Sequence, residues 1–163
     1  MTLVDDLILG EYQRTLDERY RLSIPVDMCD ALTRSSESAE CILTKERPGC
    51  LSLWNTAIWQ EKLTQGVRII QEKIVAGNMN GRIDQLQMLG RLLSTRQRTI
   101  QFAGRGRLVL PEGFREFLGV EPGGEIVIVG AAVCVELWHP DRWLDYLEGR
   151  MPKFRRLFDR LTR

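Results

Sequence analysis

Residues 19–25 read Arg19-Tyr20-Arg21-Leu22-Ser23-Ile24-Pro25, and residues 105–111 repeat the pattern as Arg105-Gly106-Arg107-Leu108-Val109-Leu110-Pro111. Both stretches follow R-x-R-L-x-Φ-P, where Φ is an aliphatic residue. Self-similarity of this kind indicates a duplicated supersecondary unit. The repeat extends to a second block, in which Cys50, Leu53, Trp54, Trp59 and Leu63 correspond to Cys134, Leu137, Trp138, Trp143 and Leu147. The sequence therefore predicts two copies of one structural unit.

Within each copy, short alternating runs predict strands, at residues 13–24, 41–45 and 50–54 and again at 99–110, 125–129 and 133–138. Helical turns are expected at residues 27–32 and 112–118, after the prolines. Each copy should close with a short helix that carries Trp59 or Trp143, with Asn55 or His139 near its start. Aliphatic residues at helical spacing on both sides of residues 77–81 predict two connecting helices.

We therefore expect a mainly β fold with added helices (α+β). The expected parts are a first half at residues 10–63, a helical connector at 64–97, a second half at 98–147 and a basic C-terminal tail at 148–163. The tail suits either an amphipathic helix that holds a partner, a mobile segment, or an extra phosphate contact.

Composition narrows the class of protein. The chain has 163 residues, 44% of them hydrophobic and 28% charged, as in an ordinary globular protein. A net charge of +1 argues against bulk electrostatic binding of nucleic acid, but not against a local basic surface. The acids Asp5 and Asp6 do not suit a signal peptide, and no apolar run spans a bilayer, so we expect a cytoplasmic protein without a membrane partner.

The cysteines, Cys29, Cys41, Cys50 and Cys134, form no C-x-x-C pair, and His139 is the single histidine. These spacings favour free, buried thiols over a zinc site, and we expect no metal and no other cofactor. The chain lacks the motifs of hydrolases, nucleotide-binding enzymes and zinc proteases. His139, where a helix is expected to begin, should have a cap-like or surface role. The sequence thus predicts a protein that is not an enzyme and has no small-molecule substrate.

The basic hairpins carry the functional prediction. Alternation along a strand places Arg19 and Arg21 on one face, and the same holds for Arg105 and Arg107. No acid occurs from residue 85 to residue 111. The planar fork of arginine binds phosphates or the edge of guanine, and a two-stranded ribbon fits the major groove. The predicted DNA-binding residues are Arg14, Arg19, Arg21, Arg98, Arg105 and Arg107.

The alternative for each hairpin is that its arginines are solvated edge residues or partners of nearby acids. Recurrence of R-x-R-L in both copies reduces the weight of that alternative, because a solvated face has no reason to repeat itself.

These residues resemble the MraZ family, whose two halves are each of the SpoVT-AbrB type. The resemblance runs from Gly10 to about Leu147 and includes the opening Gly10-Glu11-Tyr12 and the tryptophan layout of both copies. It implies swapped-hairpin, β-barrel-like halves and a regulator of transcription that binds double-stranded DNA. It further implies binding to repeats upstream of the cell division and cell wall gene cluster, ring-shaped homo-oligomers, and association with the nucleoid.

The chain departs from the family motif D-x-x-x-R. The first copy keeps the motif acid as Asp17, with Arg21, but has Tyr20 where glycine is usual; the second keeps Gly106 and Arg107 but has Ala103 in place of the aspartate. These departures bear on which DNA sequence the protein selects. We expect Arg107 to bind phosphate with less competition from an internal partner.

Two other functions remain open at the level of sequence. An AbrB-like antitoxin would bind DNA through one β half and a toxin through a tail such as residues 150–163. An RNA-binding or scaffold ring would show a preference for single-stranded RNA over duplex DNA.

Overall fold

The computed structural model describes residues 7–34, 38–77 and 82–163. Asp5, Asp6 and most of the expected link at residues 77–81 lie outside the described residues. The first copy forms β1 (Glu11–Thr15), β2 (Arg21–Ser23), α1 (Val26–Thr33), β3 (Glu40–Arg47) and β4 (Cys50–Trp54). The connection is α2 (Thr56–Val75) and α3 (Ile83–Arg96). The second copy forms β5 (Gln97–Gln101), β6 (Arg107–Val109), α4 (Phe114–Leu118), β7 (Glu125–Gly130), β8 (Val135–Trp138) and α5 (Pro140–Leu161).

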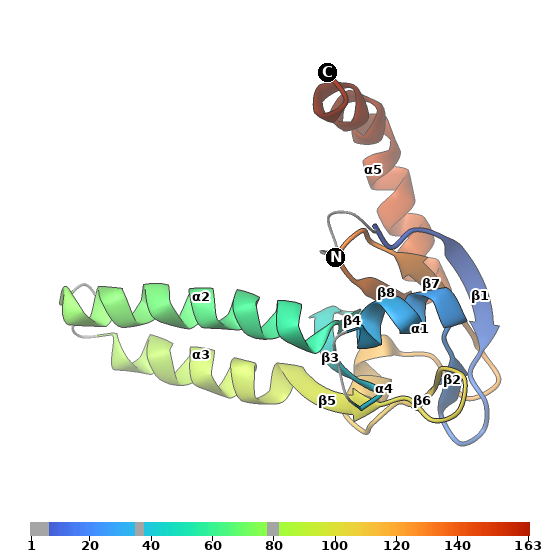
Figure 1. Cartoon of the computed structure of the whole chain (residues 1–163), viewed down its shortest axis with the longest axis horizontal. Coiled ribbons are helices and arrows are strands. Elements are labelled where there is room, and N and C mark those ends of the chain that lie inside the picture. Colours follow the sequence, from blue (N-terminus) through green and yellow to red (C-terminus); the bar gives the residue numbers. More distant parts are fainter. Residues whose placement is uncertain (1–6, 35–37, 78–81) are drawn as a thin grey trace.

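The two copies exchange their first strands. The main sheet has six antiparallel strands in the order β1-β7-β8-β4-β3-β5, so β1 of the first copy pairs with β7 of the second. In the same way β5 of the second copy pairs with β3 of the first. A separate two-stranded ribbon pairs β2 with β6. The expected swapped-hairpin arrangement and the α+β class are therefore confirmed (Figure 1).

The core lies between the six-stranded sheet, the ribbon and the two small helices α1 and α4. Leu22 and Leu108 face each other on the inner side of the ribbon and are buried together with sheet residues such as Leu43 and Ile126. Two hydrogen bonds tie the copies together symmetrically. The Ile24 N–H donates to the Gly106 carbonyl at 2.8 Å, and the Leu110 N–H donates to the Tyr20 carbonyl at 2.9 Å. The ribbon is thus anchored from both copies.

The opposite face of the sheet is covered by the first turns of α2 and α5, each through a tryptophan pair. The ring centroids of Trp54 and Trp59 are 5.7 Å apart, and those of Trp138 and Trp143 are 5.2 Å apart. The expected helix starts near Asn55 and His139 are confirmed. Both residues are caps, since Asn55 Oδ1 accepts from two N–H groups of α2 and His139 Nδ1 accepts from the Asp141 N–H.

The prediction of a short closing helix in each copy was wrong. The helix α2 has 20 residues and α5 has 22. In α2 the apolar spacing that begins at Trp59 continues without a strong helix breaker, so the closing helix and the first connecting helix are one element. The helix α5 continues through Pro152 to Leu161 and includes most of the expected tail as helix. Figure 1 shows α2 and α3 side by side, extending away from the sheet, while α5 leaves it in another direction.

The cysteines are free and buried, as expected. Burial raises the pKa of Cys29, Cys41 and Cys134 to about 12 and raises the pKa of Cys50 further. The thiols are therefore protonated at neutral pH and pack as small apolar side chains.

None of the helices among the described residues is long and apolar enough to cross a bilayer.

Candidate nucleic-acid interface

The β2–β6 ribbon presents one polar face to solvent. Arg21 pairs with Val109 and Ser23 pairs with Arg107, while Leu22 and Leu108 between them point into the core. Because side chains alternate along a strand, the outer face carries Arg21, Ser23, Arg107 and Val109. The two arginines lie at diagonal corners of this face, one from each copy. Strand exchange thus joins both R-x-R-L motifs in one surface.

The turn before β2 is built around Asp17. Its Oδ1 accepts hydrogen bonds from the backbone N–H groups of Arg19 and Arg21, both at 2.8 Å, and its Oδ2 lies 2.6 Å from Arg21 Nε. The backbone N–H of Arg21 is the largest cause that lowers the pKa of the Asp17 carboxyl. Asp17 therefore shapes the turn and orients the Arg21 guanidinium.

The expected common strand face for the arginines holds only in part. Arg21 and Arg107 begin strands, but Arg19 and Arg105 lie in the turns that precede those strands. The physical reason in the first copy is the hydrogen bonding of Asp17, together with a left-handed backbone at Tyr20, where φ is 60°. The arginine surface is consequently a ribbon with one exposed cation at each turn.

The turn before β6 has no carboxylate at the position of Asp17. The Ala103 N–H donates to the Arg107 carbonyl at 2.7 Å, and the Arg107 N–H donates to the Ala103 carbonyl at 3.0 Å. Gly104 and Gly106 both have positive φ. Neither Arg105 nor Arg107 has a hydrogen bond or an ion pair from its side chain to any described residue, and both are exposed. Their charges are available to an external anion.

The other two predicted arginines do not join the ribbon. Arg14 lies on β1 and Arg98 on β5, which are opposite edges of the six-stranded sheet. The Arg14 guanidinium donates to the Gln13 carbonyl and lies 5.4 Å from the centre of the Tyr12 ring. Arg98 is exposed.

One residue of this region escaped the sequence-based prediction. The Arg115 guanidinium carbon lies 3.9 Å from the centre of the Tyr20 ring, and Arg115 Nε donates to the Leu110 carbonyl at 2.6 Å. The available signal was the repeat itself, because the offset that aligns Tyr20 with Gly106 also aligns Cys29 with Arg115. Where the ribbon turn has Tyr20, the residue packed against it is Arg115. Where the equivalent turn has Gly106, the residue packed against it is Cys29.

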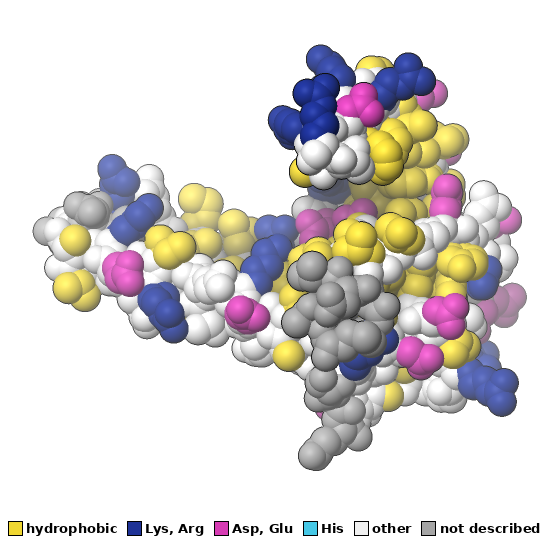
Figure 2. Space-filling view, turned by 45° about the horizontal axis from the view of Figure 1, so that its top comes forward, with side chains coloured by type: hydrophobic (Ala, Val, Ile, Leu, Met, Phe, Trp, Pro, Cys, Tyr) yellow, Lys and Arg dark blue, Asp and Glu magenta, His cyan; other side chains and the backbone are white. Residues whose placement is uncertain are grey.

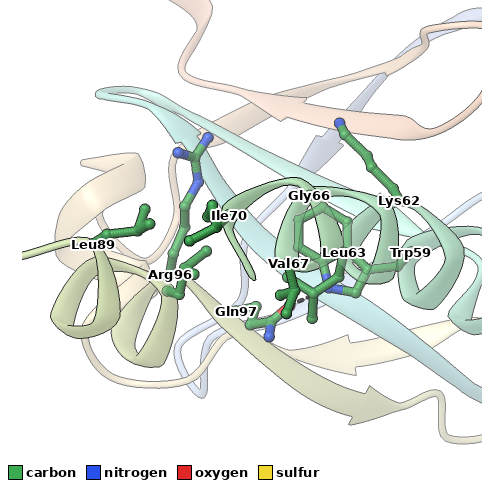
Figure 3. Close-up of a pocket in the computed structure, with 10 residues that line it drawn as sticks. Trp59, Lys62, Leu63, Gly66, Val67, Ile70, Leu89, Arg96 and Gln97 are labelled. Carbon is green, nitrogen blue, oxygen red and sulfur yellow. Dashed lines mark hydrogen bonds between the residues drawn. The ribbon is translucent and has the colours of Figure 1, made fainter. Parts of the chain in front are cut away.

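Two further surfaces lie away from the ribbon. A cavity of about 280 Å³ between α2 and α3 has an apolar wall that includes Trp59, Leu63 and Leu89, with Lys62 and Arg96 as the charged residues among those that line it (Figure 3). This lining includes no acid or thiol that would support catalysis.

Along α5, exposed hydrophobic side chains such as Phe154 and Phe158 accompany a cluster of basic residues at the end of the helix (Figure 2).

The interleaved copies and the arginine ribbon place the chain among duplicated swapped-hairpin proteins. A family model described as "MraZ protein, putative antitoxin-like" matches residues 96–162. A protein named Transcriptional regulator MraZ from Thioalkalivibrio sulfidiphilus is 30% identical over 135 residues, which cover 83% of this chain and 81% of that relative. Proteins of the same name from Roseiflexus castenholzii and Syntrophomonas wolfei are 28% identical over 143 residues and 27% identical over 156 residues. They cover 88% and 96% of this chain, and 88% and 97% of their own lengths.

The chain belongs to the MraZ family. The relatives carry the name of a transcriptional regulator and not of an enzyme.

Proposed function

We propose that this protein is a sequence-specific, double-stranded DNA-binding regulator of transcription that contacts DNA through the β2–β6 ribbon and its two turns. The observation that carries the proposal is the shared outer face of the ribbon, where Arg21 and Arg107 come together from the two copies. A two-stranded ribbon has the width to enter the major groove, and the turn residues Arg19 and Arg105 lie where they can reach the flanking phosphates.

The two arginines of the ribbon, Arg21 and Arg107, suit different contacts with DNA, one with a base and one with a phosphate. Arg21 Nε is engaged by Asp17, which leaves the terminal N–H groups oriented and free to donate as a pair to the O6 and N7 atoms of guanine. Arg107 has no such orienting acid, so it suits the less directional contact with a phosphate. DNA contact is thus divided unevenly between the copies.

The family resemblance extends the proposal to the target and the assembly. We propose that the protein acts on repeats in the promoter of the cell division and cell wall gene cluster, as a ring-shaped homo-oligomer in the cytoplasm, on the nucleoid. Several weak ribbon contacts on repeated DNA sites would gain affinity from multivalency. Arg14 and Arg98, at the sheet edges, would contribute where bound DNA runs beyond the ribbon.

The test is a gel-shift titration with duplex DNA from that promoter at several salt concentrations. Arg107→Ala should weaken binding and lower the salt slope by about one phosphate contact, while Arg21→Ala should reduce discrimination between the repeat and a scrambled duplex. Arg68→Ala, an exposed arginine of α2, is the matched control for loss of charge. Unchanged binding by the Arg21→Ala, Arg107→Ala double variant would exclude the ribbon as the contact surface.

Ala103→Asp tests the unequal roles directly. A carboxylate at this position would stand where Asp17 stands in the first copy, so it should pair with Arg107 and weaken DNA binding. Affinity equal to that of the wild type would show that the missing acid has no part in phosphate binding.

An antitoxin is the second candidate function, favoured by the antitoxin-like description of the matching family and by the exposed hydrophobic side chains of α5. Co-purification of a small toxin with the wild-type chain, and its loss on Phe154→Asp, would support this candidate. A clean homo-oligomer without a second protein would count against it.

A further inference from the structure

The first turn of the ribbon holds an unusual backbone conformation. Tyr20 has a φ of 60°, in the left-handed region that a residue with a large side chain adopts only at a conformational cost. Its carbonyl accepts from the Leu110 N–H across the ribbon, so the conformation fixes how the two strands meet. Some interaction must therefore hold Tyr20 in place.

Within the turn the Tyr20 N–H donates to the Asp17 carbonyl at 3.0 Å, and Arg115 adds an interaction from the other copy. Its guanidinium stacks on the Tyr20 ring at 3.9 Å, and its Nε donates to the carbonyl of Leu110, the same residue that donates to Tyr20. Tyr20, Leu110 and Arg115 thus form a closed set of contacts. One face of the guanidinium lies on the ring and its Nε is hydrogen-bonded, so Arg115 is held against Tyr20 and Leu110.

The equivalent place in the second copy uses close packing instead. A Cβ atom at Gly106 would lie 2.6 Å from Cys29 Sγ and 2.7 Å from the Ile24 carbonyl oxygen, so the site has no room for a side chain. Cys29 occupies the position that corresponds to Arg115. One copy therefore holds its turn with glycine against cysteine, and the other with tyrosine against arginine.

We propose that Arg115 is a positioning residue for DNA binding: through Tyr20 it holds the first turn in the conformation that presents Arg19 and Arg21. This inference rests on the proposed function of the ribbon. Loss of Arg115 leaves every DNA-contacting arginine in place but requires the turn to be ordered on binding. Affinity then falls while the number of phosphate contacts stays the same.

The DNA test uses a duplex that the wild-type protein selects from a random pool. Arg115→Ala should weaken binding roughly 3- to 30-fold, the range expected for loss of one cation–π contact, with an unchanged salt slope. Tyr20→Phe keeps the ring and should bind like the wild type. Arg47→Ala, which removes an arginine stacked on Tyr146 of α5, controls for loss of charge and of a cation–π pair. Unchanged affinity in Arg115→Ala would overturn the proposal, as would a slope reduced by about one, which would mark a direct phosphate contact.

A double-variant cycle separates a coupled pair from two independent effects. If Arg115 acts through Tyr20, then Arg115→Ala together with Tyr20→Ala should bind no more weakly than the worse single variant. Additive losses would mean that Arg115 acts by another route.

A measurement without DNA keeps this inference distinct from the proposed function. In hydrogen exchange followed by mass spectrometry, Arg115→Ala should speed exchange in residues 16–22 and leave residues 102–108 unchanged. If the wild type selects no duplex, the DNA-binding proposal fails, and the exchange result still decides whether Arg115 holds the turn. Equal protection of residues 16–22 in the wild type and the variant would overturn the inference in either case.

Discussion

At the scale of the residue, the copies have diverged where their turns meet the core. Gly106 is required by contact as well as by conformation, since its φ is 95° and its backbone lies against Cys29 and Ile24. Gly104 in the same turn also has positive φ, 55°, but a Cβ atom there would meet nothing within 4 Å. Comparing alanine substitutions at the two glycines therefore distinguishes the energetic cost of a steric clash from the cost of backbone strain.

Gly106→Ala should destabilise the protein by about 2–4 kcal/mol, because backbone strain and a clash with the Ile24 carbonyl add together. Gly104→Ala should cost about 1 kcal/mol, from its left-handed backbone alone. Urea denaturation followed by tryptophan fluorescence measures both. Equal midpoints for the two variants would mean that the close approach at Gly106 carries no energetic weight.

At the scale of the element, the two long helices begin in different ways. Asn55 Oδ1 accepts from the Ala57 and Ile58 N–H groups, and its Nδ2 donates to the carbonyls of Leu32 and Arg34. Through these hydrogen bonds Asn55 caps α2 and also holds the end of α1. Its side chain is buried. His139 caps α5 with a single hydrogen bond and is less buried.

Asn55→Ala should therefore lower the free energy of unfolding by about 2–3 kcal/mol, from loss of a cap and from two carbonyls left without their donor. His139→Ala should cost about 0.5–1 kcal/mol, the ordinary value of a cap. Thermal unfolding by circular dichroism compares them at one pH. A larger loss for His139→Ala would contradict the assigned role of Asn55.

At the scale of the whole molecule, neither copy completes its own sheet. The strand β1 takes its partner from the second copy, β5 takes its partner from the first, and the ribbon needs one strand from each. A copy by itself would leave the edges of β3 and β7 unpaired and the inner face of its ribbon strand exposed.

We expect a fragment of residues 7–77 to be either unfolded or a self-paired dimer when it is expressed alone. Mixing it with a fragment of residues 82–163 should yield a folded one-to-one complex, since each fragment supplies the strands that the other lacks. Light scattering with circular dichroism distinguishes these states. A folded monomer of the first fragment would show that strand exchange is not needed for stability.

Local chemistry in the sequence determined a large part of this structure. Alternation located the strands, the prolines marked the ends of the ribbon strands, Asn55 and His139 marked the helix starts, and the repeat predicted the duplication. These features depend on neighbours along the chain, within a few residues, so they can be read before the fold is known.

Only the tertiary structure decided which strands pair, which arginines share a face and what holds Tyr20. The pairs β1–β7 and β2–β6, and the stack of Tyr20 on Arg115, join residues far apart in sequence. No local pattern encodes them, because they depend on burying the apolar faces of both copies at once. For that reason the arginines of two separate motifs became one surface only when the chain folded.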